Sequence, residues 1–166
     1  MSLDDIQLGP SLAAGLYKKT LVDIDNHQSK TEASKKETLT VLGGNSQRIC
    51  IFVNEAHFPF LSDEDMEFLT GVLAACKLSM ADVALMNAAG STSLNYQLLN
   101  SELAPSIILF FGTDPAATGL PLQFPHYQLQ KYNGQTFLSA PALKILSENK
   151  EEKKKLWLSL KTLFNI

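Results

Sequence analysis

The sequence predicts an α/β domain, a three-layer α/β/α sandwich in which helices cover both faces of a mainly parallel central sheet. From residue 48 onward, short apolar runs alternate with longer segments whose apolar residues recur at helical spacing. That order is typical of parallel strands joined by crossover helices. The runs at 48–54 and 106–111 are almost continuously apolar, as in strands covered on both faces. A hydrophobic content of 45% and a charged content of 19% fit a globular core.

The first half of the domain is expected to run strand, helix, strand. The first strand is expected at 48–54. Ser62 should start a helix, because Asp65 follows it by three residues in a variant of the capping box. The apolar face of that helix is expected to consist of Met66, Phe68, Leu69, Val72, Leu73 and Cys76. Ser79 and Asp82 repeat the start signal for one turn, before a second strand at 83–87.

The second half continues the alternation. We expect a helix from about Tyr96 that Pro105 closes, a third strand at 106–111 ended by Gly112, and one helical turn within 113–118. A fourth strand is expected near 127–129 and a fifth at 135–138, after the tight turn of Asn133 and Gly134. The last helix is expected at about 150–164, with lysines on a solvated face. Its apolar stripe is expected to consist of Leu156, Trp157, Leu160, Leu163 and Phe164.

Residues 1–38 are predicted to form an extension outside this domain, which then spans 39–166. Apolar residues recur at roughly helical spacing in 12–24, whereas 25–37 is polar and typical of a linker or exposed loop. A short amphipathic segment on a polar linker can fold upon a protein partner. The residues expected to contact such a partner are Leu12, Leu16, Tyr17 and Leu21. A second interpretation, that this segment packs on its own domain, stays open.

Composition excludes several classes of function. The net charge of −3 gives no overall basic field, so charge does not support contact with DNA or with an anionic membrane. The acidic N-terminus lacks the pattern of a signal peptide, and no apolar run approaches the length of a membrane span. We therefore expect a cytoplasmic protein.

The cysteines and histidines do not predict a metal site. Cys50 and Cys76 lie among apolar residues and are expected to be buried free thiols. His27, His57 and His126 show no ligand spacing. No metal and no cofactor are expected.

Polar residues follow the ends of the predicted strands, where open α/β sheets bind their ligands. The residues of this predicted crevice are Asn54, Glu55, His57, Asn87, Thr113 and Ser139. A carboxylate at the mouth of the first strand is well placed to be a general base. The other interpretation is that Glu55 caps a strand-end loop, and spacing alone favours it.

The order of these patches resembles the uracil-DNA glycosylase superfamily, over roughly residues 48–164. Residues 52–57 read Phe-Val-Asn-Glu-Ala-His, where a small bacterial and archaeal branch has a strand ending in Gly-Glu-Ala-Pro-Gly. Residues 78–83 read Leu-Ser-Met-Ala-Asp-Val and lead to a strand ending in Asn87. Residues 139–143 read Ser-Ala-Pro-Ala-Leu, in the place of a His-Pro-Ser turn, and a helix with lysines and Trp157 follows. The resemblance implies the glycosylase-type sandwich.

The departures from that superfamily lie where its chemistry would be. Its active members use the histidine of the His-Pro-Ser turn to stabilise developing negative charge, and this chain has Ala140 there. Asn54 replaces a glycine, His57 replaces a proline, and the cluster-binding cysteines of that branch are missing. Glu55 remains.

The Ser-Ala-Pro-Ala-Leu turn and the later pair Leu156-Trp157 also resemble the psi subunits of bacterial DNA polymerase III clamp loaders, which look like non-catalytic members of the same fold. In psi subunits an N-terminal extension grips the clamp loader, and the globular part binds the chi subunit, which contacts single-strand binding protein. The resemblance implies a non-catalytic interaction protein of DNA replication or repair, with a partner in the clamp-loader or single-strand-binding machinery. Two alternatives stay open. One is a diverged uracil-DNA glycosylase that uses Glu55 on water, with His57 or Asn87 reading the base; the other is a small-ligand binder that uses the crevice.

Overall fold

The computed structural model describes residues 39–89, 95–121 and 123–166, and residues 39–166 form one compact unit. Leu12, Leu16, Tyr17 and Leu21 lie outside the described residues. None of the helices in the described part of the chain is long and apolar enough to cross a membrane.

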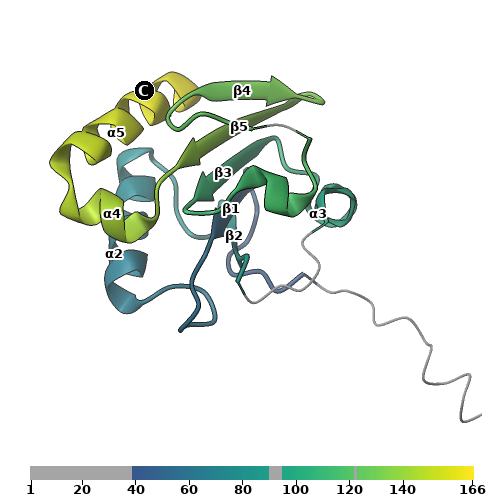
Figure 1. Cartoon of the computed structure of the whole chain (residues 1–166), viewed down its shortest axis with the longest axis horizontal. Coiled ribbons are helices and arrows are strands. Elements are labelled where there is room, and N and C mark those ends of the chain that lie inside the picture. Colours follow the sequence, from purple (N-terminus) through teal and green to yellow (C-terminus); the bar gives the residue numbers. More distant parts are fainter. Residues whose placement is uncertain (1–38, 90–94, 122) are drawn as a thin grey trace, which may run out of the picture. The chain divides into compact units, whose positions relative to one another are not determined.

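The domain is built on one five-stranded sheet with the strand order β2-β1-β3-β5-β4 (Figure 1). Strands β1 (Ile49–Val53), β2 (Val83–Asn87), β3 (Ile107–Phe111) and β5 (Gln135–Ala140) are parallel, and β4 (Leu129–Tyr132) pairs antiparallel with β5. The carboxyl ends of β2, β1, β3 and β5 therefore share one edge of the sheet. The predicted mainly parallel sheet is confirmed.

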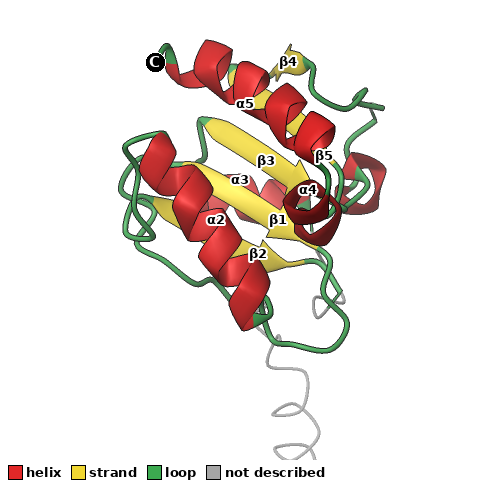
Figure 2. Cartoon of the chain, turned by 90° about the vertical axis from the view of Figure 1, so that its left-hand side faces the viewer, coloured by secondary structure: helices red, strands yellow, loops and turns green. Residues whose placement is uncertain are grey.

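Helices cover both faces of the sheet, as Figures 1 and 2 show. One face carries α2 (Asp63–Ala75), α4 (Leu143–Glu148) and α5 (Lys150–Phe164). The other carries α3 (Tyr96–Leu103) and the short 3₁₀ turn η2 (Pro115–Thr118). This arrangement confirms an α/β domain with a covered sheet.

Alternation along the strands divides the core between the two faces. Ile49, Ile51 and Val53 face α2, α4 and α5, whereas Cys50 and Phe52 face α3. On the α3 side, buried phenylalanine rings stack across the sheet, with ring centroids 5.2 to 6.5 Å apart. The stacked rings are those of Phe52, Phe110, Phe137 and Phe124.

The helix ends form where local sequence signals predict them. The Ser62 hydroxyl accepts a hydrogen bond from the Asp65 backbone N–H (3.3 Å), which confirms the predicted cap of α2. α3 ends at Leu103, and the capping residue Ala104 has a φ of 41° and directly precedes Pro105. α5 begins at Lys150 because Asn149 caps its first turn.

Two strands differ from the prediction by more than one residue at an end, whereas β1 is one residue shorter at each end and β3 is one residue shorter at its start. β4 begins at Leu129 rather than near Tyr127, because Tyr127 has a φ of 65° and lies in a turn, where its N–H donates to the Ser139 carbonyl (2.8 Å) before the antiparallel ladder starts. β5 continues beyond Leu138 to Ala140, because Gly112 N–H donates to the Ala140 carbonyl (3.0 Å) and pairing with β3 goes on. Ala140 is therefore a strand residue rather than a turn residue.

Candidate functional site

The structure places the six predicted crevice residues at one edge of the sheet, in two groups. Asn54, Glu55, His57 and Asn87 follow or end β1 and β2. Thr113 and Ser139 lie at the ends of β3 and β5, where they line a pocket of about 610 Å³. None of the first four residues lines that pocket.

Asn87 organises the loop that follows β1. Its side-chain amide donates to the carbonyls of Glu55 (2.7 Å), Phe58 (3.0 Å) and Pro59 (3.2 Å). Its side-chain oxygen accepts from the backbone N–H groups of Glu55 (3.0 Å) and Ala89 (3.1 Å). Asn87 is 6% exposed, so these bonds satisfy a buried amide and fix the path of the loop.

The Glu55 side chain makes a hydrogen bond within its own loop. Its Oε1 accepts from the His57 backbone N–H at 3.1 Å, so the carboxylate caps the turn beyond β1. This contact agrees with the interpretation that Glu55 caps a strand-end loop. The side chains of Asn54 and His57 are exposed.

The pocket at the ends of β3 and β5 holds two neighbouring polar side chains that the sequence analysis did not pair. His126 Nδ1 lies 3.3 Å from the hydroxyl oxygen of Ser139. Both residues line the pocket, together with Thr113, Asp114 and Gln123. His126 stands in a loop with no ligand spacing, so no signal in the sequence singled it out.

The loop that carries His126 is fixed to α5 through Tyr127. The Tyr127 hydroxyl donates to the Glu152 carboxylate, and the Ser159 hydroxyl donates to the Tyr127 carbonyl (2.7 Å). Lys155 also donates to Glu152, at 2.7 Å. The bond from Lys155, followed by that from Tyr127, holds the pKa of the Glu152 carboxyl below its usual range. Burial, with the neighbouring Glu152, raises the pKa of the Tyr127 hydroxyl above its usual range.

Ala140 lies beside this pocket but belongs to the core. It is 1% exposed and packs in the apolar cluster beneath the helices, with Leu138, Leu143 and Leu146. Ser139, one residue earlier, lines the pocket on the opposite face of β5. The position that resembles the glycosylase histidine therefore places an apolar side chain among apolar neighbours.

Gly112 lines the pocket at the point where the end of β3 meets the start of α4. It has a φ of 64°, and a β-carbon added there would lie 2.8 Å from that of Ala142. Glycine meets both demands because it lacks a β-carbon. The end of β3 and the start of α4 can therefore approach each other closely.

No group of three or more potential metal-ligating side chains occurs within residues 39–89, 95–121 and 123–166. No protein-family model matches the chain, and no curated protein sequence matches it.

Proposed function

We propose that this protein is a non-catalytic interaction protein with a uracil-DNA glycosylase-like fold. It resembles the psi subunits of DNA polymerase III clamp loaders, and it acts in DNA replication or repair through protein contacts. The observation that carries the proposal is Ala140, a buried apolar residue where the resembling enzymes place their charge-stabilising histidine. An alanine side chain cannot donate a hydrogen bond.

Two of the other candidate catalytic groups, Asn87 and Glu55, are engaged in structural contacts, whereas the side chain of His57 is exposed. The Asn87 amide holds three carbonyls of the loop beyond β1, and the Glu55 carboxylate caps the same loop. Loss of a single oxyanion donor removes about 3 to 4 kcal/mol of transition-state stabilisation, or roughly 10²- to 10³-fold in rate. These features support a fold retained for binding rather than for excision of a base.

One observation favours the alternative of a diverged glycosylase. His126 brings an imidazole to the same pocket from a different loop, 3.3 Å from Ser139. An imidazole there could stabilise developing charge in place of the missing histidine. In this alternative Glu55, which does not itself line the pocket of His126, remains the group that activates water.

Incubation with uracil-containing single- and double-stranded DNA, followed by alkali, separates the two functions. We expect no strand cleavage above that of buffer, with an active uracil-DNA glycosylase as the positive control. Cleavage that disappears in Glu55→Gln or His126→Ala would instead establish the glycosylase. Lys131→Ala, at an exposed position of β4 outside the crevice, controls for loss of activity through handling.

A binding assay tests the part assigned to the N-terminal extension. Full-length protein and a full-length variant with serine at Leu12, Leu16, Tyr17 and Leu21 are compared for capture of purified clamp-loader subunits and single-strand binding protein. We expect capture by the wild type and at least tenfold weaker capture by the variant. Equal capture would remove the role of these four residues, and no capture by either would refute the proposed partners.

A further inference from the structure

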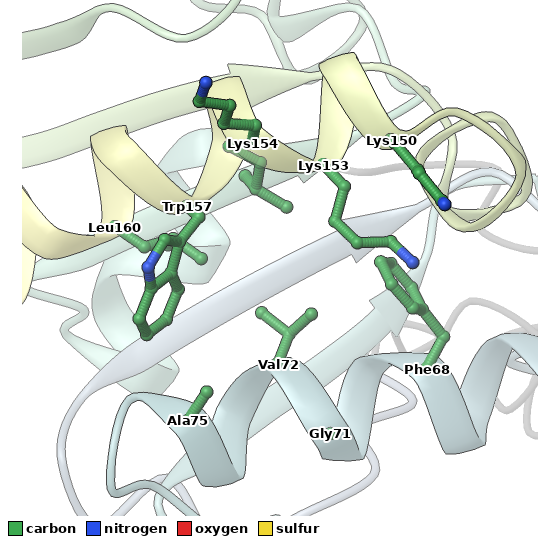
Figure 3. A pocket seen from close by; sticks show the side chains of 10 residues that line it. Phe68, Gly71, Val72, Ala75, Lys150, Lys153, Lys154, Trp157 and Leu160 are labelled. Atoms are coloured by element: carbon green, nitrogen blue, oxygen red, sulfur yellow. The ribbon is translucent and has the colours of Figure 1, made fainter.

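A second concave surface is separate from the strand-end pocket. It is an open groove of about 600 Å³ between α2 and α5 (Figure 3). Phe68, Val72 and Ala75 line it from α2, and Trp157 and Leu160 line it from α5. The groove shares no lining residue with the strand-end pocket.

The groove floor leaves apolar surface uncovered. The side chains of Phe68, Val72 and Trp157 are only half-buried, although all three pack on the core cluster beneath. In Figure 3 the indole of Trp157 hangs from α5 toward Ala75, and Val72 points up between the two helices. These half-buried apolar side chains, rimmed by charge, are available for contact with a partner.

The rim of the groove is positively charged. Lys150, Lys153 and Lys154 line it from the exposed side of α5, and no carboxylate lines it. Lys153 reaches across to α2, where its Nζ lies 5.1 Å from the centre of the Phe68 ring. Within the described part of the chain the single ion pair joins Lys155 to Glu152, so the rim lysines have no carboxylate partner there. Because the whole chain carries a net charge of −3, this basic rim is a local feature.

Neither the packing nor the backbone conformation of α2 requires a glycine at position 71. Gly71 lies inside α2, where glycine destabilises a helix by about 1 kcal/mol relative to alanine. A β-carbon added at Gly71 meets no atom within 4 Å, and its φ is not positive. Gly71 lines the groove, one turn before Ala75, and the two small residues leave room for another backbone to approach.

The walls of the groove restrict what can occupy it. Both walls are helices, whose interior N–H and C=O groups are already paired within the helix. An extended segment in the groove would leave its own backbone groups without partners against apolar side chains, at a high cost in free energy. A helix satisfies its own backbone, and the groove length from Phe68 to Ala75 is about 10 Å, or two turns of the occupant.

We propose that this groove binds an acidic amphipathic helix of a protein partner, with apolar side chains on the floor and carboxylates at Lys150, Lys153 and Lys154. The proposal goes beyond the function proposed above, because it concerns a separate face and does not depend on the N-terminal extension or on the crevice. A helix also fits the groove better than an acyl chain does. A helix is wide enough to contact both α2 and α5, whereas an acyl chain is thinner and would stay exposed to solvent on one side.

Selection from a displayed library of amphipathic helical peptides, with variable charge on the polar face, tests the proposal on the full chain. We expect acidic peptides to be enriched. Trp157 is the only tryptophan of the chain, so its emission should shift to shorter wavelength as a selected peptide covers it. Affinity should fall at least tenfold between low salt and 0.5 M salt, because exposed charge pairs are screened.

Two groove variants and two matched controls locate the binding. Gly71→Met fills the floor and Lys153→Glu with Lys154→Glu reverses the rim, and each should weaken the selected peptide at least tenfold. Ala74→Met adds the same side chain to an exposed position of α2 outside the groove, and Lys131→Glu reverses an exposed lysine on β4. Both controls should bind as the wild type does. Because Gly71→Met replaces a helix-interior glycine, its thermal midpoint should equal or exceed that of the wild type.

Several outcomes would overturn the proposal. These are no enrichment of acidic peptides, enrichment that Gly71→Met leaves unchanged, or stronger binding of basic peptides. A concentration-dependent dimer that Gly71→Met abolishes would assign the groove to a second copy of the chain. A Trp157 shift with laurate but with no selected peptide would assign it to an anionic amphiphile.

Discussion

Asn87→Ala is predicted to destabilise the domain by about 2–4 kcal/mol, because one buried side chain holds the loop that leaves β1. The amide has two protons shared among three carbonyls, so it makes about two full hydrogen bonds, and its oxygen accepts two more. At about 1 kcal/mol for each bond, the four contribute about 4 kcal/mol. Water can reach part of this loop after the substitution, which lowers the expected loss toward 2 kcal/mol.

Urea unfolding followed by Trp157 fluorescence measures this loss. With a slope of about 2 kcal/mol per M urea, the midpoint should fall by about 1 to 2 M. Asn87→Asp keeps the acceptors but removes both donors and places a charge beside carbonyl oxygens, so it should be at least as destabilising. The neighbouring exposed Asn54→Ala should change stability by less than about 0.5 kcal/mol.

A loss below about 1 kcal/mol for Asn87→Ala, with an unchanged urea slope, would refute this reasoning. It would mean that the loop is held by the strands rather than by the amide. Asn87 would then regain its standing as a candidate for reading a base, because its side chain would not be needed for the fold.

The remaining predictions concern the pocket wall, an acidic group and a thiol. Gly112→Ala should destabilise the domain by about 2–4 kcal/mol in urea unfolding, because Gly112 has a positive φ and lies close to the start of α4. Gly119→Ala should cost only about 1 kcal/mol of folding stability, because Gly119 has a φ of 80° but open space around it. The pKa of the Glu152 carboxyl is lowered in the folded state, so its contribution to folding stability is present above the ordinary pKa near 4.5 and is lost as pH falls through the folded value. The stability difference between wild type and Glu152→Gln should therefore shrink below about pH 4.5 in acid unfolding. Burial raises the pKa of the Cys50 thiol to about 12, so a thiol reagent at pH 8 should label this residue only after denaturation, as mass spectrometry of peptides can measure. Rapid labelling of the native protein at Cys50 would contradict its burial.

Local signals in the sequence were sufficient to predict most of the fold. Continuous apolar runs gave β1 and β3, because strands buried on both faces tolerate few polar residues. Caps such as Ser62 placed the helix starts, because a cap acts within one turn of chain. The predicted β4 boundary was wrong because Tyr127 has a positive φ and its backbone hydrogen-bonds to residues distant in the sequence, Ser139 on β5 and Ser159 on α5.

The candidate site was less predictable because its geometry depends on distant residues. Ser139 was predicted to line the crevice, but His126 has no motif of its own and reaches Ser139 only because a loop returns to the end of β5. The groove was also missed, since the spacing on α5 shows a lysine face but not its position relative to α2. Gly71 was the available signal, as a glycine inside an otherwise regular helical pattern.

Strand alternation at Ser139 and Ala140 decides what chemistry the strand-end pocket can hold. Successive side chains of β5 point to opposite faces, so Ala140 joins the apolar core while Ser139 meets His126 in the pocket. A histidine restored at position 140 would enter the core, where desolvation disfavours its charged form. His126, rather than position 140, is therefore the residue that distinguishes the two proposed functions. An active protein must depend on His126, and an interaction protein must tolerate its loss.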